Sequence, residues 1–364
     1  MKDFKTFLSQ KAQFYKDIEF HSVLKAFAMI RNQIDFKKVV HIVGTNGKGS
    51  TGRALAYMLF KKGQKVTHFS SPHIKSFNER IWIDGADIDD GYLQTCHEQL
   101  LDLLDGFEKK LSYFEYATLL AFIAAKKSDY LILEAGLGGE FDATNVITSD
   151  ITIVTPIGYD HQEYLGNTIE QIAATKMRAS DKCMVVAKQH YSQVYGVANE
   201  IDPKNLQVQI DPDFFIKGYL GENIQTAVFV LKILGYDFTK DILEGFMVPG
   251  RVQKLTPNIT IDVGHNPLAA LAVAQSIEYG TVLVYNSLKD KDIAAVLKIL
   301  QPKIKRVEIL DFENERVVDK QVIQNVCKDL SIRCSTYRAV DQKENYLVFG
   351  SFYTVEKFLK QEGL

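Results

Sequence analysis

The sequence has few of the features that mark secreted or membrane proteins. Its 364 residues include only four cysteines, which are scattered without Cys-x-x-Cys spacing (Cys96, Cys183, Cys327 and Cys334). This pattern predicts neither a disulfide framework nor a thiolate metal site. No apolar run approaches the length of a membrane span, and the first residues lack the apolar centre of a signal peptide. We therefore expect a cytoplasmic protein that does not associate with a membrane.

Neither positive nor negative charge predominates in the sequence. Lysine and arginine number 43 against 45 aspartates and glutamates, which gives a formal net charge of −2, and no long basic run occurs. Proteins that bind nucleic acid usually carry a basic stripe, so we expect no nucleic-acid partner. Apolar residues make up 46% and charged residues 24% of the chain, as in ordinary globular proteins. The length favours two domains.

Short β-branched runs alternate with amphipathic segments along the whole chain. The runs that predict strands are "KKVVHIV", "KVTHF", "DYLILEAG", "DITIVTP", "CMVVA", "NITIDVG", "TVLVYN", "RVEIL" and "NYLVFG". Helical patterns between them include "TGRALAYMLFKKG", "FEYATLLAFIAAKK", "NTIEQIAATKM" and "QTAVFVLKILG". Such alternation indicates an α/β fold with mostly parallel sheets.

One segment breaks this alternation and suggests a domain boundary. Pro249, Gly250 and Pro257 punctuate "GFMVPGRVQKLTPN". We therefore predict a large domain of the phosphate-loop nucleotide-binding type, with a mostly parallel sheet, over residues 1–247. A smaller Rossmann-like α/β domain is expected over residues 248–364. A catalytic cleft between the two domains would be typical of such an arrangement.

A glycine-rich turn in the first domain has the features of a phosphate site. The apolar run ending at Val43 leads into "GTNGKGST", and a helical pattern follows. Glycines at this place let backbone amides face a phosphate, and a helix N-terminus adds partial positive charge. Lys48 is expected to contact phosphate oxygens, while Ser50 or Thr51 is a candidate Mg²⁺ ligand. Gly49 separates the lysine from Ser50, which departs from the usual phosphate-loop pattern.

Other polar residues follow predicted strands of the same domain. Glu134 ends an apolar strand and is followed by glycines, so it is a candidate Mg²⁺ ligand. The pair Asp160-His161 follows another strand and is expected at the same edge of the sheet. Asp142, in a loop, fits either a structural cap or a ligand contact. Lys176 lies among apolar neighbours; it is either a solvated lysine or one that becomes a metal ligand by carbamylation.

The smaller domain offers fewer candidates. Arg251 follows the boundary segment and could stabilise charge on a transferring phosphate. Asp262, after a strand, could accept ribose hydroxyls. His265 and Asn266 lie in "GHNP", which on its own indicates only a turn.

Taken together and in order, these segments resemble the folylpolyglutamate synthase/dihydrofolate synthase family, a branch of the Mur-ligase superfamily. The phosphate loop "GTNGKGST" matches the family's loop, including the glycine after the lysine. The other matching segments are "SSPHIKSFNERI", "YFEYATLLAF", "LILEAGLGGEFDATNVI", "DHQEYLGNTIEQIA", "PGR", "DVGHNP" and "GSFYTVE". They extend from residue 41 to residue 355, which is nearly the whole chain.

The resemblance implies a role for each matching position. ATP would be bound by Gly47, Lys48, Gly49, Ser50, Asn223, Arg251 and Asp262. Divalent metal would be held by Ser71, Glu134, His161 and Lys176, the last as a carbamate. The pterin pocket would include Ser112, Phe114 and Asp142, and the incoming glutamate would meet His265 and Ser351. The residues expected to take part in catalysis are Lys48, His161, Lys176 and Arg251.

The resemblance also implies the reaction. ATP and two Mg²⁺ ions would activate the carboxylate of a pterin substrate as an acyl phosphate, and L-glutamate would then form the amide. The substrates expected are dihydropteroate, which gives dihydrofolate, and reduced folates, which give polyglutamates. All partners would be small molecules, and nothing demands more than a monomer.

Several alternatives stay open at this stage. The enzyme could extend folates only, or it could be a Mur ligase acting on cell-wall precursors. A GTP-binding regulator is disfavoured because "NSLKDKD" lacks the spacing of a guanine-reading motif. A relative that binds ATP without ligase activity is suggested by the unusual context Thr175-Lys176-Met177-Arg178.

Overall fold

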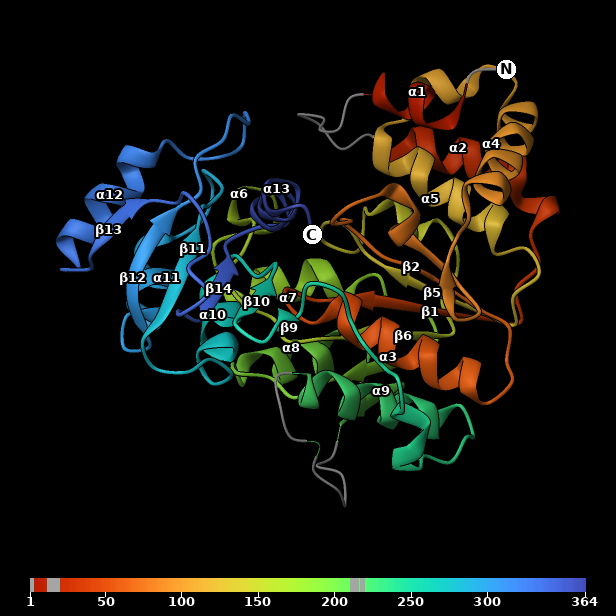
Figure 1. Cartoon of the computed structure of the whole chain (residues 1–364). Helices are drawn as coiled ribbons and strands as arrows, with labels where there is room; N and C mark the ends of the chain where they lie inside the picture. Colours follow the sequence, from red (N-terminus) through yellow and green to blue (C-terminus); the bar gives the residue numbers. More distant parts are fainter. Residues whose placement is uncertain (1–2, 12–19, 210–215, 217–219) are drawn as a thin grey trace. The chain divides into compact units, whose positions relative to one another are not determined.

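The computed structural model describes residues 3–11, 20–209, 216 and 220–364 (Figure 1). The chain divides into two compact units. Unit 1 comprises Met1–Phe215 and Glu222–Phe246, and unit 2 comprises Ile216–Gly221 and Met247–Leu364. Within the described part of the chain, no helix is both long and apolar enough to cross a bilayer.

Unit 1 is built on an eight-stranded sheet, sheet A, with the order β4-β3-β2-β5-β1-β6-β7-β8. Its strands are β1 (Lys38–Val43), β2 (Val66–Phe69), β3 (Ile81–Ile83), β4 (Ala86–Asp87), β5 (Tyr130–Glu134), β6 (Ile151–Val154), β7 (Met184–Val186) and β8 (Leu206–Val208). In this order, every neighbouring pair from β2 through β5, β1, β6 and β7 to β8 is parallel. The β2–β3 and β3–β4 pairs are antiparallel. The carboxyl ends of β5, β1 and β6 therefore share one edge of the sheet.

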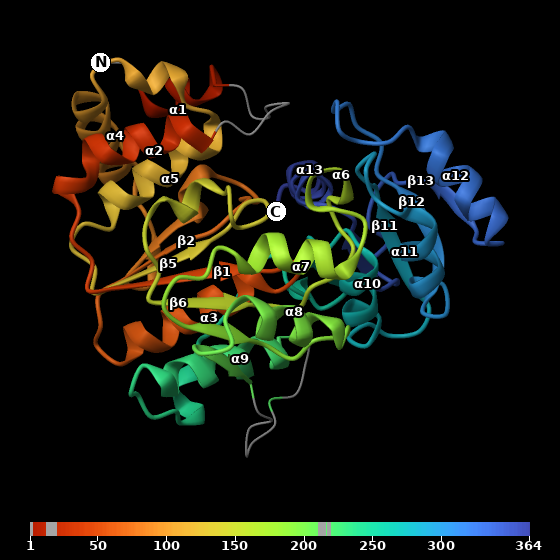
Figure 2. The same ribbon diagram turned by 180° about the vertical axis from the view of Figure 1, so that it is seen from behind.

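Helices cover both faces of sheet A (Figures 1 and 2). They are α1 (Phe4–Ser9), α2 (Phe20–Ile30), α3 (Lys48–Lys61), α4 (Asp90–Leu104), α5 (Tyr113–Ala124), α6 (Gln162–Leu165), α7 (Ile169–Met177), α8 (Gln193–Ile201) and α9 (Gly221–Ile233). In β1, Val39 packs with the cluster formed by α1, α2, α4 and α5, and Val43 packs with α7 and α8. Ile42, one residue along the strand, faces Gly52 of α3 on the opposite side. Strands buried on both faces explain why the sequence runs are continuously apolar.

Unit 2 has a six-stranded sheet, sheet B, in the order β13-β12-β11-β14-β10-β9. Its elements are β9 (Gln253–Thr256), β10 (Ile259–Asp262), α10 (Pro267–Ala274), β11 (Thr281–Tyr285), α11 (Ile293–Leu300), β12 (Ile304–Ile309), α12 (Lys320–Asp329), β13 (Cys334–Thr336), β14 (Tyr346–Phe349) and α13 (Phe352–Glu362). Only the β9–β10 pair is antiparallel among these described strands. Leu347 and Phe349 of β14 pack with α10, α11 and α12, and Tyr346 and Val348 are buried as well.

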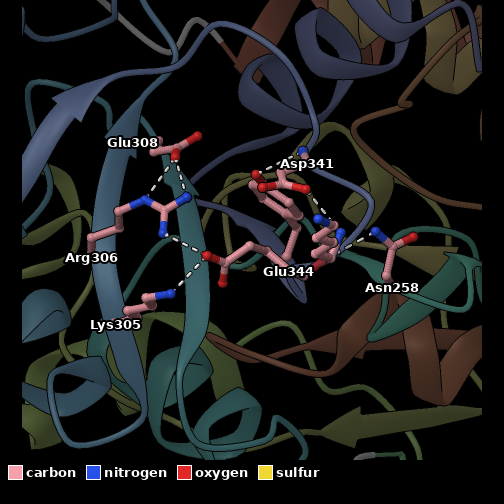
Figure 3. Close-up of polar contacts among 8 residues, drawn as sticks. Asn258, Lys305, Arg306, Glu308, Asp341 and Glu344 are labelled. Carbon is pink, nitrogen blue, oxygen red and sulfur yellow. Dashed lines mark hydrogen bonds and ion pairs between the residues drawn. The ribbon is translucent and has the colours of Figure 1, made fainter.

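An ion-pair cluster closes the edge of sheet B where β10, β12 and β14 begin (Figure 3). Arg306 donates through Nε and Nη2 to Glu308, both at 2.8 Å, and through Nη1 to Glu344 at 3.3 Å. Lys305 also contacts Glu344, at 2.7 Å, while Asn258 donates to the backbone carbonyl of Glu344. The cluster fastens the loop before β14 at the edge opposite to the one that carries Asp262 and Ser351.

The predicted α/β class with mostly parallel sheets is confirmed, and each of the nine predicted strand segments contains a strand. Five strands were not predicted: β3, β4, β8, β9 and β13. They contain two to four residues each, and most of their side chains are exposed or only half-buried. Such strands lack the apolar signal by which a buried strand is found.

Candidate active site

The glycine-rich turn forms a phosphate loop between β1 and α3. Gly44 and Gly47 have φ values of 141° and 86°, a region that favours glycine. A Cβ at Gly44 would overlap Thr155, and one at Gly47 would overlap the side chain of Asn223. Lys48 begins α3, and its Nζ lies 3.2 Å from the carbonyl oxygen of Gly44. The lysine therefore curls back over the loop, where a phosphate would lie against the helix N-terminus.

The loop is held from behind by the segment that follows β6. The amides of Thr45 and Asn46 both donate to the carbonyl of Pro156, at 3.0 and 3.2 Å. The Thr45 hydroxyl donates to the carbonyl of Gly158 and accepts from its amide. Gln189 braces the same segment by accepting from the amide of Ile157 at 2.9 Å. Sequence reasoning missed these supports, because a backbone acceptor such as Pro156 leaves no mark in residue identity.

Glu134, at the end of β5, is placed beside this loop. The side chain is 6% exposed, and its Oε2 accepts from the amide of Ser71 at 3.1 Å. A Cβ at Gly49 would lie 3.1 Å from the same oxygen. The distinctive glycine after Lys48 therefore gives the carboxylate room to approach the first turn of α3. Three predicted residues from separate strands and loops, Ser71, Glu134 and Gly49, are thus brought together.

We expect Gly49→Ala to lower turnover about tenfold and to raise the Mg²⁺ concentration needed for half-maximal rate, because the added methyl displaces the Glu134 carboxylate. A magnesium titration at saturating ATP measures this. Gly196→Ala in α8 is the matched control, since a Cβ there meets nothing within 4 Å. An unchanged magnesium requirement in Gly49→Ala would remove the glycine from this role.

Lys176 lies in the last turn of α7 and is only 4% exposed. Burial lowers the pKa of its ammonium to about 7, and the positive charge of Lys48 acts in the same direction. The carboxylates of Asp160 and Asp142 oppose this shift. The solvated lysine considered from the sequence is therefore excluded. A neutral buried amine near pH 7 is the form that reacts with carbon dioxide, so carbamylation stays a prediction with a suitable group in place.

His161 follows β6 in a left-handed conformation, with φ 51°, and precedes the short helix α6. Its amide donates to Oδ1 of Asp160 at 3.0 Å, and its Nε2 lies 3.9 Å from the same oxygen. The imidazole is one-third exposed. The pair therefore forms a local unit of carboxylate and imidazole at the sheet edge that carries Glu134.

The residues predicted for the pterin side all lie in unit 1. The Ser112 hydroxyl accepts from the amide of Glu115 and caps α5, which leaves its proton free to donate. The ring of Phe114 would meet a Cβ at Gly136 at 2.7 Å, so this glycine lets the ring lie against the chain that leaves β5. Asp142 is 5% exposed and caps the short turn Ala143–Val146. Asp142 is thus a buried cap; its contact with a ligand stays a prediction.

Asn223 lies in the first turn of α9 and approaches the phosphate loop and the start of α3. Its Oδ1 is 3.4 Å from the hydroxyl of Thr51, and it is the atom that a Cβ at Gly47 would meet. The shortened segment "GENIQTA" therefore still delivers an amide side chain to the loop. Its contact with ATP stays a prediction.

In unit 2, Asp262 organises the turn after β10. The carboxylate is fully buried; Oδ1 accepts from the amide of Gly264 at 2.7 Å, and Oδ2 accepts from the amide of Val252 at 3.0 Å. Arg251, next to this second donor, lies over the ring of Phe352 at 5.8 Å. These contacts explain the burial of Asp262 and hold Arg251 at the same sheet edge. The nucleotide contacts of both residues remain predictions.

We expect Asp262→Asn to lower the free energy of unfolding by about 2 kcal/mol, because one amide oxygen cannot accept both backbone donors. Chemical denaturation of the whole chain measures this. Asp311→Asn, at an exposed ion pair with Lys320, is the control and should change the value by less than about 0.5 kcal/mol. Equal effects of the two variants would contradict the role of Asp262.

The two residues predicted for glutamate follow neighbouring strands of sheet B. His265 comes after β10, and its Nδ1 lies 3.3 Å from the carbonyl of Val263. Ser351 follows β14, is 1% exposed, and caps α13 by accepting from the amide of Thr354. Because β10 and β14 pair in parallel, both residues lie at one edge of the sheet.

The geometry of unit 1 is typical of a nucleotide-binding site. A phosphate loop at the edge of a parallel sheet can hold the phosphates of a nucleotide, and a buried carboxylate against its helix is a candidate ligand for a divalent metal. Residues 42–209 match the model of the Mur ligase middle domain. Unit 1 therefore contains a Mur ligase middle domain.

Relatives narrow this class. The chain is 30% identical over 390 residues to the dihydrofolate synthase/folylpolyglutamate synthase of Buchnera aphidicola, covering 92% of this chain and 91% of that protein. The crystal structure of Helicobacter pylori folylpolyglutamate synthetase matches with a TM-score of 0.80 and 36% identity, covering 98% and 97% of the two chains. The bifunctional Yersinia pestis enzyme complexed with AMPPNP and Mn ion matches with a TM-score of 0.85 and 25% identity, covering 99% and 97%. The chain belongs to the dihydrofolate synthase/folylpolyglutamate synthase family.

Proposed function

We propose that the chain is an ATP-dependent ligase that joins L-glutamate to the carboxylate of a pterin substrate through an acyl phosphate. The observation that carries this proposal is the close approach of the Glu134 carboxylate to the phosphate loop at Gly49, in a chain of this family. The substrate carboxylate attacks the γ-phosphate of ATP and ADP leaves. The amine of glutamate then attacks the acyl phosphate, the amide forms, and inorganic phosphate is released.

The residues at the sheet edge fit a divalent metal. Carboxylate, hydroxyl and imidazole are ligands of Mg²⁺ or Mn²⁺ in proteins, and the Glu134 carboxylate is buried and accepts from the amide of Ser71. We assign Ser71, Glu134 and His161 to this role, with Lys176 after carbamylation at a second ion. Bound Mg²⁺ would neutralise phosphate charge during transfer.

The chain's own groups would do the remaining work. Lys48 neutralises charge on the phosphates, and the amides of the first turn of α3 orient them. Arg251 would add a second positive charge during transfer. Exclusion of water protects the acyl phosphate, which would otherwise hydrolyse before glutamate arrives.

We assign the ATP-binding domain to residues 1–247 and the smaller ligase domain to residues 248–364. Dihydropteroate or a reduced folate would lie against Ser112, Phe114 and Asp142, where an aromatic face can stack on a flat ring. His265 and Ser351 would meet the glutamate. We further propose that the chain acts in the cytoplasm as a monomer and that its partners are small molecules.

The acceptor can be decided by one comparison. We expect glutamate incorporation with dihydropteroate and with tetrahydrofolate, as in a bifunctional enzyme. Activity with tetrahydrofolate alone would support the second candidate, a folylpolyglutamate synthase, which the name of the Helicobacter pylori relative favours. Activity with neither acceptor would contradict both. UDP-muramoyl substrates serve as the control for a cell-wall ligase.

A further inference from the structure

We propose that a buried hydrogen-bond chain from His41 through Thr144 fixes the Asp142 carboxylate and so sets the affinity for the pterin substrate. His41 and Thr144 are positioning residues in this account, because they act through Asp142. The inference rests on the proposed function, in which Asp142 belongs to the pterin pocket.

The chain is continuous over three side chains. The Thr144 hydroxyl donates to Oδ1 of Asp142 at 2.5 Å, and its oxygen lies 2.7 Å from Nε2 of His41. Because the Thr144 hydroxyl donates its proton to the carboxylate, its oxygen is left to accept, and it accepts from Nε2 of His41 in the tautomer that is protonated there. The amides of Thr144 and Leu137 complete the shell of Asp142, at 3.0 and 2.8 Å. Each carboxylate oxygen is therefore directed by protein donors, and rotation of the group is opposed.

All three side chains are removed from water. The exposed fractions of His41, Thr144 and Asp142 are 1%, 1% and 5%. Hydrogen bonds to a charged group in such surroundings are stronger than neutral ones in water, and a broken bond leaves a partner without water to replace it. A methyl group in place of the Thr144 hydroxyl should therefore disturb the orientation of Asp142.

The chain also reaches two parts of the nucleotide site. His41 lies in the middle of β1, three residues before Gly44 of the phosphate loop. The loop before Asp142 is docked on the end of α7, where a Cβ at Gly139 would lie 2.5 Å from the Lys176 carbonyl oxygen. The loop that carries Asp142 is thus joined to β1 through His41 and packs against the end of α7 at Gly139.

Binding measurements test this more directly than turnover does. We expect Thr144→Val to weaken binding of dihydropteroate about tenfold or more, because a hydrogen bond to the carboxylate is lost. Binding of ADP should stay within about twofold of the unaltered protein. Thr144→Ser keeps the hydroxyl and should restore dihydropteroate binding. Calorimetric titration of the whole chain with each ligand gives both constants.

Thr67→Val is the matched control, since Thr67 is a buried threonine of unit 1 whose hydroxyl forms a hydrogen bond with Ser128, at 2.7 Å. This variant should leave both constants unchanged. His41→Phe breaks the chain one step earlier and gives a second test if Thr144→Val does not fold. Equal loss of ADP and dihydropteroate binding, or no loss in either chain variant, would overturn the inference.

The two proposals can fail separately. A protein that binds dihydropteroate but forms no ADP with it would contradict the proposed function. The inference would still be decided by how much Thr144→Val weakens dihydropteroate binding relative to ADP binding. A protein that turns over dihydropteroate with Thr144→Val at unaltered affinity would overturn the inference alone.

Discussion

Lys48→Met is expected to reduce ATP turnover about a hundred- to a thousandfold, because a positive charge aimed at the phosphates is removed. Methionine is unbranched and apolar, so the start of α3 should persist. The Nζ of Lys48 lies 3.2 Å from the carbonyl of Gly44 and 3.4 Å from that of Thr45, which places it over the loop. Steady-state formation of ADP with acceptor and glutamate present measures the effect.

Lys61→Met provides the matched control for Lys48→Met. Lys61 ends the same helix and is exposed, so its loss should change turnover by less than about twofold. A similar rate in the two variants would remove Lys48 from the transfer step. The free energies of unfolding of the two variants should agree within about 1 kcal/mol, since neither lysine is part of the buried core.

We expect Lys176→Met to have two opposed effects, a loss of turnover and a gain in stability. Turnover should fall at least about a hundredfold, because an apolar side chain cannot become a carbamate or hold a metal. Stability should rise, because a lysine that is 4% exposed is replaced by an apolar side chain of similar length. Lys204→Met, at an exposed turn, should change neither quantity. Full activity of Lys176→Met would exclude the lysine from the mechanism.

The stability gain should depend on pH in a defined direction. Burial lowers the pKa of Lys176 from 10.5 to about 7 in the folded chain, so the unfolded chain binds more protons between these values. The destabilisation is complete below about pH 7 and falls by up to about 1.4 kcal/mol for each pH unit above it. The advantage of Lys176→Met should therefore be largest at pH 6–7 and shrink toward pH 10. Urea unfolding in buffer free of carbon dioxide measures it; a constant advantage would contradict a charged buried amine.

Much of the nucleotide side could be predicted from the sequence because the signals there are local. The glycines of "GTNGKGST" are needed for backbone angles and close approach, and the structure shows this at Gly44, Gly47 and Gly49. Glu134 was predictable because it ends an apolar strand beside that of the loop. In both places, one short stretch contains the physical reason.

Other parts depend on contacts between distant residues, which local patterns do not carry. The Pro156 carbonyl that holds the phosphate loop lies more than a hundred residues after it. In the sequence, nothing distinguishes His41 from the other residues of its strand. In the structure it forms a hydrogen bond with Thr144, 103 positions away. From its place after a strand, Asp262 was predicted to contact ribose. In the structure its buried carboxylate accepts hydrogen bonds from the amides of Val252 and Gly264.

The central claim is that ATP is consumed only to join glutamate to a pterin acid. The most direct measurement is ADP formation by the whole chain with Mg²⁺ and ATP, with dihydropteroate or L-glutamate omitted in turn. We predict rapid ADP release only when both are present, with one dihydrofolate formed for each ADP. ADP release at the same rate without the pterin would contradict the account.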